Sequence, residues 1–135
     1  MPECKLIEFG KVQNQQLLSN AFSIARKCDQ FAIEMVASYG MPVGREVFET
    51  CVWIGRFIQA AKMYYNFVYR KDEKLCLCAD SRAKDSNIRQ ALIDRYAKFD
   101  FKNGKGTKKN PDTFYGVSKD VWQAIAVAVT HYEKR

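Results

Sequence analysis

A single carboxylate lies in the middle of an apolar segment near the start of the chain. Residues 31–36 have the length and composition of a buried strand, and Glu34 is the charged residue among them. Burying an unpaired carboxylate is costly, so such a group is protonated, paired or bound to a metal ion. We therefore expect Glu34 to have a partner, and a metal-binding strand is the interpretation that links it to the residues below.

A second acidic residue, Asp120, begins the last apolar segment of the chain. Compensation of the helix dipole explains an acid in a first helical turn and is worth about 0.3 to 1 kcal/mol at an exposed N-terminus. Helical spacing also places Asp120, Ala124 and Ala128 on one face, with His131 at its end and Gln123 beside it. This face is polar or small, so a hydrated ion could fit against its first turn. Gln123 could bind a metal-bound water, or it could form its hydrogen bonds within the core.

Basic residues gather in two stretches of the second half of the chain. A helix start carries three of them and a glycine-containing loop carries four, and both could contact the phosphates of DNA. A solvated loop explains the second set equally well. The seven residues are Arg82, Lys84, Arg89, Lys102, Lys105, Lys108 and Lys109.

Four aromatic residues, Tyr64, Tyr65, Phe67 and Tyr69, are close together in a β-prone segment. Such side chains can stack on unpaired bases, but packing on a sheet face is the commoner role of aromatic residues in a strand. The two tryptophans are expected to anchor packing, although one could serve a dimer interface.

Length and composition suit one compact domain over residues 1–135, because 47% of the residues are hydrophobic and can form a single core. Lys and Arg number 22 against 15 Asp and Glu, which gives a net charge of +7. This balance favours polyanionic partners such as nucleic acid. Because many basic proteins bind no nucleic acid, the charge is mild support only.

The five cysteines are odd in number, and we expect them to be free thiols in a reducing cytosol. One histidine and one Cys-x-Cys spacing do not complete the usual structural zinc set. The first residues show no basic segment leading into an apolar stretch, and no apolar run approaches membrane-spanning length. These features indicate a cytoplasmic protein without a membrane partner.

Alternating periodicities divide the chain into strands and helices. Strand-like segments cover residues 5–12, 31–36 and 64–69. Helical spacing predicts helices over 14–27, from 44 to about 61, from 85 to about 96 and after Ser118. Residues 74–79 could be strand or helix, and we favour helix, whereas 98–113 are predicted to be a long polar loop.

Local signals mark where the helices begin. Asn14 and either Asp85 or Ser86 have side chains that cap helix N-termini. Gly44 marks the start of the second helix, and Gly55 within it would allow close packing against the sheet. Together the patterns indicate an α/β fold, a sheet with helices on its faces. Two or three strands are fewer than sheets usually contain, which suggests that further strands have been lost.

Three of these segments, in this order, resemble the Holliday-junction resolvases of the RuvC type. The first is 31–34 with the helix after it, the second is the basic helix start at 81–88, and the third is the closing run at 120–131. The closing run is the most specific, because it is similar to the family's last helix in its alternating alanines and its Thr-His ending. The resemblance covers most of the chain, with the family's opening strand absent.

This resemblance implies a ribonuclease-H-like fold and a nuclease that holds two Mg²⁺ or Mn²⁺ ions between carboxylates of its strands and its last helix. Two such ions activate a water and stabilise the leaving oxygen of a phosphodiester, and Mg²⁺ prefers hard oxygen ligands. By position, Glu34 matches the family's strand glutamate and Asp120 the first acid of its closing Asp-x-x-Asp pair. Gln123 stands where the second acid would be, which leaves one anionic ligand fewer. Lys84 resembles the family's phosphate-facing lysine.

The chain departs from the family at its start. The family places its first catalytic aspartate on an opening strand, in a Gly-x-Asp-x-Gly-like pattern, whereas the first aspartate here is Asp29. Residues 6–11 are similar to one of the family's later strands. We therefore expect Met1 to be an internal start and the chain to be N-terminally truncated. Without the central strand it would expose strand edges and core surface, and be less stable than a complete relative.

The leading hypothesis is a divalent-metal-dependent endonuclease that acts on branched DNA and resolves Holliday junctions as a homodimer. In it, Glu34 and Asp120 are catalytic and hold metal together with Gln123. A second hypothesis is a non-catalytic DNA-binding module derived from such a nuclease, because the first aspartate is missing and Gln123 replaces an acid. A third is a protein-interaction domain without affinity for nucleic acid, suggested by the aromatic residues.

Overall fold

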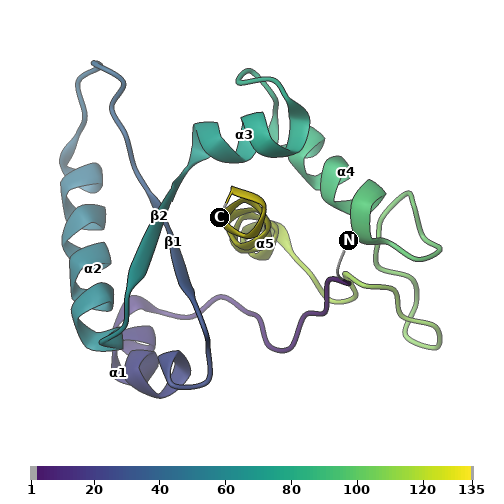
Figure 1. The fold of residues 1–135 in the computed structure, drawn as a ribbon, viewed down its shortest axis with the longest axis horizontal. Helices are drawn as coiled ribbons and strands as arrows, with labels where there is room; N and C mark the ends of the chain where they lie inside the picture. The colour runs from purple at the N-terminus through teal and green to yellow at the C-terminus, as the bar shows by residue number, and fades with distance from the viewer. Residues whose placement is uncertain (1–2, 135) are drawn as a thin grey trace. The chain divides into compact units, whose positions relative to one another are not determined.

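The chain folds into helices and one small sheet, and the computed structural model describes residues 3–134 (Figure 1). The helices are α1 (Asn14–Ala25), α2 (Arg45–Ala61), α3 (Arg70–Cys78), α4 (Asp85–Tyr96) and α5 (Lys119–Lys134). The strands are β1 (Phe31–Met35) and β2 (Tyr65–Tyr69), which pair in parallel. Over the described residues the fold is therefore α/β, as the sequence predicts.

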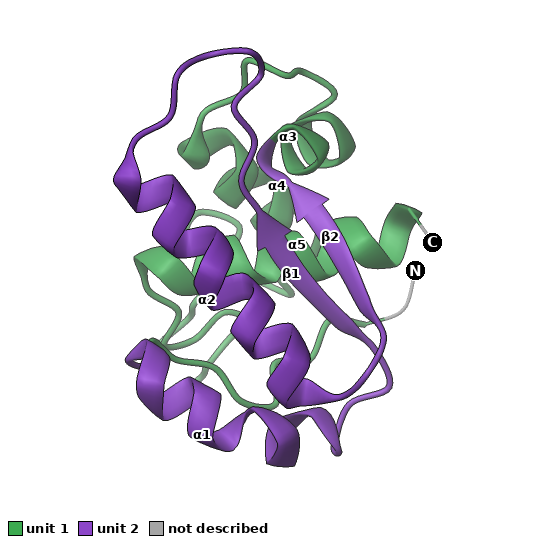
Figure 2. Cartoon of the chain, turned by 90° about the vertical axis from the view of Figure 1, so that its left-hand side faces the viewer, with its two compact units in different colours: residues 1–11, 71–135 green, residues 12–70 purple. Residues whose placement is uncertain are grey.

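Two compact units make up the chain (Figure 2). Unit 1 comprises residues 1–11 and 71–135, and unit 2 comprises residues 12–70. Helices α3, α4 and α5 belong to unit 1 apart from Arg70, and α1, β1, α2 and β2 belong to unit 2. That residues 1–135 behave as one domain stays a prediction.

Unit 2 is built around a β1–α2–β2 crossover. Parallel strands need a long connection, and α2 supplies it between β1 and β2. The register pairs Phe31 with Tyr65 and Met35 with Tyr69, and the Asn66 side-chain amide donates to the Phe31 carbonyl oxygen at 3.1 Å. Helix α2 ends at Ala61, and its C-cap residue Lys62 has a left-handed φ of 53°. The predicted strands in this region are confirmed.

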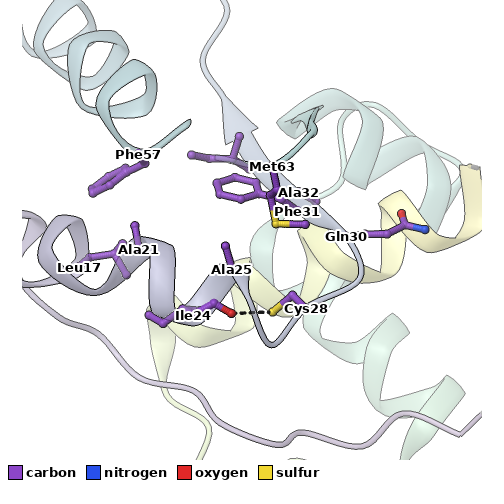
Figure 3. A pocket seen from close by; sticks show the side chains of 11 residues that line it. Leu17, Ala21, Ile24, Ala25, Cys28, Gln30, Phe31, Ala32, Phe57 and Met63 are labelled. Carbon is purple, nitrogen blue, oxygen red and sulfur yellow. Dashed lines mark hydrogen bonds between the residues drawn. The ribbon is translucent and has the colours of Figure 1, made fainter. Parts of the chain in front are cut away.

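Helix α1 packs against α2, but the two helices and the sheet leave an apolar hollow between them. Its volume is about 240 Å³, and Figure 3 shows the side chains around it. Leu17 and Ile24 come from α1, Phe57 from α2 and Phe31 from β1. Cys28 lies at its edge, where its Sγ donates to the Ile24 carbonyl oxygen at 3.4 Å. Helices α1 and α2 and the sheet therefore leave an apolar pocket that is partly open to solvent.

Unit 1 has a continuous core beneath its three helices. The ring of Phe114 is fully buried and lies 4.8 Å from that of Trp122. Helix α5 is mostly buried between Val121 and Val129, which confirms the expectation from its apolar sequence, and Trp122 is a packing anchor as predicted. The core cluster contains Leu77, Ile88, Leu92, Ile93, Phe114, Val117, Val121, Trp122, Ile125, Ala126 and Val129.

The predicted strand at residues 5–12 is wrong. This N-terminal segment has no strand conformation. A strand needs a neighbouring strand to satisfy its backbone groups, and the described part of unit 1 contains no named strand. Cys4 and Leu6 instead pack against the core cluster, and Glu3 accepts from Lys98 at 2.7 Å. Side chains rather than a backbone ladder thus attach the N-terminal segment to unit 1.

Three local expectations also need correction. Asn14 is the first residue of α1, and Gln13 precedes it as the N-cap without a side-chain hydrogen bond. Helix α4 begins at Asp85 with Lys84 as its N-cap, so neither Asp85 nor Ser86 caps it. A Cβ added to Gly55 would meet nothing within 4 Å, so this glycine makes no close approach to the sheet. The remaining predicted helices are confirmed, and of residues 74–79 the first five lie in α3, which ends at Cys78.

Candidate functional site

Asp120 lies in the first turn of α5, and this turn is closed by backbone hydrogen bonds. The Ser118 carbonyl oxygen accepts from the N–H groups of Val121 and Trp122 at 3.0 and 3.2 Å. The apolar residues that follow are buried, which leaves Asp120 at the exposed end of the helix. Local sequence and burial together therefore place its carboxylate at the surface of unit 1.

Lys11 from the N-terminal segment reaches this carboxylate. Its Nζ lies 2.7 Å from Asp120 Oδ2, and both side chains are mostly exposed. The hydrogen bond and the charge of Lys11 lower the pKa of Asp120, and Asp120 raises the pKa of Lys11 in return. Asp120 is thus held ionised, with a cation already beside it.

Gln123 follows Asp120 by one helical turn and borders the same cavity. This cavity has a volume of about 260 Å³ and is also lined by Asp85, Arg89 and Lys119. The Gln123 Oε1 atom is buried and accepts no hydrogen bond from the protein. A buried acceptor left in this state is costly, so a donor such as a water molecule or a ligand N–H would stabilise it.

A second and larger cavity adjoins the first, because both are lined by Arg89 and Trp122. Its volume is about 530 Å³, and its basic residues are Arg89, Lys102 and Lys105. The Arg89 guanidinium lies 5.7 Å from the centre of the Trp122 ring, where it is attracted to the ring face. The carboxylate oxygens of Asp120 and the amide oxygen of Gln123 therefore line a cavity that adjoins the larger, basic one.

The loop between α4 and α5 carries two of these lysines and is organised by a buried aspartate. Asp112 accepts hydrogen bonds from the backbone N–H groups of Lys98, Phe99 and Asp100 at 2.8 to 3.2 Å, and from that of Thr113 at 2.7 Å. Burial opposes ionisation of this carboxyl, but the backbone donors outweigh it and hold its pKa well below the usual range. Asp112 is therefore a charged anchor for the loop.

A second aspartate fixes the turn that bears Lys102 and Lys105. Asp100 accepts from the backbone N–H groups of Asn103 at 3.1 Å and Gly106 at 2.9 Å, and these two donors lower its pKa. The predicted polar loop is present, and its backbone is held at several points by these carboxylates.

The seven basic residues that the sequence nominated for DNA contact divide into two sets. Arg89, Lys102 and Lys105 line the larger cavity, and the other four do not. Arg82 interacts with Asp80 through its backbone N–H at 2.9 Å and its guanidinium at 3.5 Å, and the Lys84 backbone N–H donates to Asn87. Lys108 and Lys109 are exposed at the loop tip.

Glu34 lies in unit 2, whereas Asp120 lies in unit 1. Glu34 is half-buried in β1, opposite Val68 of β2, and it has an electrostatic or hydrogen-bonding partner. A metal site shared by Glu34 and Asp120 stays a prediction.

The donor atoms at the start of α5 fit part of a magnesium site. Asp120 and Gln123 supply two hard oxygen donors three residues apart, on one side of a helix and at one cavity. Mg²⁺ takes six such ligands, and commonly keeps several of them as water. Within residues 3–134, no three His, Cys, Asp or Glu side chains come close enough together to hold a metal ion.

Sequence reasoning missed three residues that shape this site and one buried acid outside it. Asp112 and Asp100 resemble ordinary loop acids, because their partners are backbone groups that no residue pattern reveals. Lys11 lies in the segment predicted to be a strand, and nothing in the sequence pattern indicates its contact with Asp120. Glu73 is fully buried in α3, although its charged neighbours suggest an exposed turn.

No protein-family model, curated protein sequence or solved structure matches this chain. The resemblance to RuvC-type resolvases therefore rests on the sequence segments themselves. Two further observations bear on the sequence predictions. All five cysteines are free thiols, as predicted. Among the described helices, none combines the length and apolar character needed to cross a membrane.

Proposed function

We propose that this chain is a divalent-metal-dependent endonuclease of ribonuclease-H-like fold that acts on branched DNA. One observation carries the proposal. Asp120 and Gln123, which can donate oxygen atoms to a metal ion, line a cavity that shares Arg89 and Trp122 with a basic cavity. A nuclease needs both features side by side, because phosphate must be held where its ester bond is broken.

Each side chain has a definite part in this chemistry. The Asp120 carboxylate and the Gln123 amide oxygen would hold Mg²⁺ or Mn²⁺, with Glu34 joining them by resemblance. When bound, the metal supplies an activated water and stabilises charge on the leaving oxygen. Arg89 and Lys119 line the same cavity. Their charges would offset that of the phosphodiester and orient it for in-line attack.

Lys11 would have to leave Asp120 for metal to bind fully. Its ion pair with Asp120 is exposed, and exposed ion pairs are weakened by water and salt. A divalent ion carries twice the charge of the ammonium group, so it should compete well for the carboxylate. The ion pair would therefore raise the metal concentration needed for activity without preventing metal binding.

The test is cleavage of a labelled four-way DNA junction, with the matching linear duplex as the comparison substrate. We expect junction cleavage in Mn²⁺ or Mg²⁺, none in EDTA, and a loss of at least about a hundredfold in Asp120→Asn, since a ligand oxygen and its charge are removed. Asp29→Asn, which changes an exposed acid of unit 2, is the matched control and should leave cleavage unchanged. Cleavage that survives Asp120→Asn would overturn the assignment.

A non-catalytic DNA-binding module is the second candidate, and the Lys11–Asp120 contact favours it. A lysine that neutralises the acid makes the basic cavity the principal feature of the site. This candidate predicts junction binding that weakens steeply with salt, without cleavage in either metal. Glu34→Gln should then leave binding unchanged.

A further inference from the structure

Three positive side chains converge on the larger cavity of unit 1 without an acidic side chain among its lining residues. Like charges brought together repel one another, so Arg89, Lys102 and Lys105 would be stabilised by an anion between them. The cavity volume of about 530 Å³ falls within the range of small-ligand sites. Its charge and size therefore fit a phosphate group together with the sugar that carries it.

The backbone that bears Lys102 and Lys105 is fixed before any ligand arrives. The Gly104 N–H donates to the Asp100 carbonyl oxygen at 2.7 Å. A Cβ at Gly104 would lie 2.9 Å from side-chain atoms of both Ile93 and Phe114, so this turn sits directly on the core. A rigid turn loses little entropy when its side chains bind, which favours affinity.

Arg89 lines the same cavity from a different element. It lies on α4, with its guanidinium 5.7 Å from the centre of the Trp122 ring. Trp122 is almost completely buried, so this contact ties Arg89 to the core cluster. Two independent parts of unit 1 thus present cations to one place, as a bound anion requires.

The tip of the same loop provides an internal contrast. Thr107 and Asn110 close a tight turn through reciprocal backbone hydrogen bonds of 3.0 and 3.2 Å. Lys108 and Lys109 lie within that turn, are exposed and do not line the cavity. They have the same charge as Lys102 and Lys105 and are only a few residues away. If net charge alone determined DNA affinity, the two lysine pairs would contribute equally. If the cavity is a specific site, Lys102 and Lys105 should contribute more.

We propose that Arg89, Lys102 and Lys105 form a cradle for one internal backbone phosphate of a DNA strand, separate from the phosphate at Asp120. This cradle deepens the proposed function, since it rests on a DNA substrate, but it does not depend on cleavage. Because the two cavities share Arg89 and Trp122, a strand held in the cradle continues directly to the Asp120 cavity. The cradle would therefore fix the register of the strand beside the acid.

The experiment measures binding of a fluorescein-labelled single-stranded oligonucleotide with a 5′-hydroxyl, by anisotropy in EDTA. Arg89→Met, Lys102→Met and Lys105→Met should each weaken binding about tenfold at 0.15 M salt and reduce the slope of log K against log salt by about 0.7. The double variant Lys108→Met/Lys109→Met removes two charges but should change affinity only about twofold. Thermal unfolding of each variant checks that it has folded.

Two results would overturn the cradle. One is a loss in the Lys108/Lys109 double variant as large as that in the cradle variants, since binding would then follow net charge. The other is a loss seen only with an oligonucleotide that carries a 5′-phosphate, because the cavity would then hold a terminal phosphate. Since binding is measured without divalent metal, failure of the nuclease proposal would leave the cradle result intact, and the reverse also holds.

Discussion

Unit 1 and unit 2 bury their apolar residues to very different extents. Unit 1 encloses Leu92, Ile93 and Phe114 almost completely, together with eight further core residues. The buried hydrophobic residues of unit 2 are Ala21, Ala25, Ile54, Ala61 and Val68, of which three are alanines. Because burial free energy scales with apolar area, unit 1 has much the larger hydrophobic stabilisation.

Both units expose large apolar side chains, and in unit 2 these include residues of α2 and β2. Phe48 and Val52, one turn apart on α2, are 63% and 62% exposed, and Tyr65 and Phe67 on β2 are also exposed. The ring centres of Tyr65 and Phe67 lie 5.0 Å apart with the ring planes tilted by 47°, so these two aromatic side chains contact each other. Contiguous exposed apolar surface marks a face that a partner covers or that promotes aggregation. The units therefore differ in how completely their cores are buried, and unit 2 leaves apolar side chains of α2 and β2 in contact with water.

The largest expected difference comes from truncating one phenylalanine in each unit. Phe114→Ala should lower the free energy of unfolding by about 4 kcal/mol, because it leaves a cavity in a filled core. Phe48→Ala should change it by less than about 0.5 kcal/mol, since its side chain already contacts water. Urea unfolding followed by tryptophan fluorescence measures both. Equal losses would show that the two units are packed alike.

Removing the charged anchor of the loop should have the next largest effect. Asp112→Ala would leave four backbone N–H groups without their acceptor and should cost about 3 kcal/mol. Asp29→Ala, at an exposed position of unit 2, should cost little. Calorimetric unfolding provides the measurement, and a small effect of Asp112→Ala would mean that the loop is held by other contacts.

The same anchor predicts a pH dependence. The folded pKa of Asp112 lies below that of a carboxyl in the unfolded chain, which is about 3.9. The contribution of the ionised Asp112 carboxylate to the free energy of unfolding is therefore complete above about pH 4. It is lost as the pH falls through the lower pKa of the folded state. Stability should fall below about pH 4 in the parent protein and fall less in Asp112→Asn. Unfolding curves of the parent and of Asp112→Asn, recorded between pH 2 and 7, provide the measurement. An equal loss of stability in the two proteins at low pH would contradict the role of Asp112.

A glycine in each unit should respond with opposite sign to the same substitution. Gly106 has a φ of 66°, and an added Cβ would lie 2.4 Å from the Asn110 carbonyl oxygen and 2.7 Å from the Asp112 nitrogen. Gly106→Ala should therefore cost about 2 kcal/mol. Gly55→Ala, in an open helical position, should stabilise by about 0.5 to 1 kcal/mol. Thermal unfolding of the two variants measures both effects. Destabilisation by both substitutions would contradict the expected difference between the two glycines.

The smallest expected effect concerns the ion pair at the candidate metal site. Lys11→Met removes the ammonium beside Asp120, so Mn²⁺ should bind a few times more tightly than to the parent protein. Water-proton relaxation measures the Mn²⁺ affinity of both proteins. Lys27→Met, which changes an exposed lysine of unit 2, serves as the control. Unchanged Mn²⁺ affinity in Lys11→Met would mean that the ion pair does not compete with metal.

The periodic elements of the fold could be predicted from the sequence because their signals are local. Residues 31–36 and 64–69 alternate or cluster apolar side chains, and the closing helix carries an apolar stripe that must be buried. The wrong prediction of a strand at residues 5–12 arises because strand formation also depends on non-local contacts. Alternation there was genuine, but a strand also requires a neighbour, and neighbours are set by tertiary structure.

The candidate site could be predicted only in part. Asp120, Gln123 and Arg89 were nominated from type and position, and the structure brings them to one cavity. The roles of Asp100 and Asp112 depend on backbone donors several residues away, so residue type alone gives no signal. Charge alone also did not separate the cavity lysines from those at the loop tip.

The two parts of unit 1 are separated along the chain by all of unit 2. During synthesis the N-terminal segment leaves the ribosome before unit 2, whereas α5, which carries the partner of Lys11, leaves after it. Unit 2 can therefore begin to fold while unit 1 is still incomplete. Assembly of the Lys11–Asp120 ion pair is therefore a step that follows synthesis of the whole of unit 2.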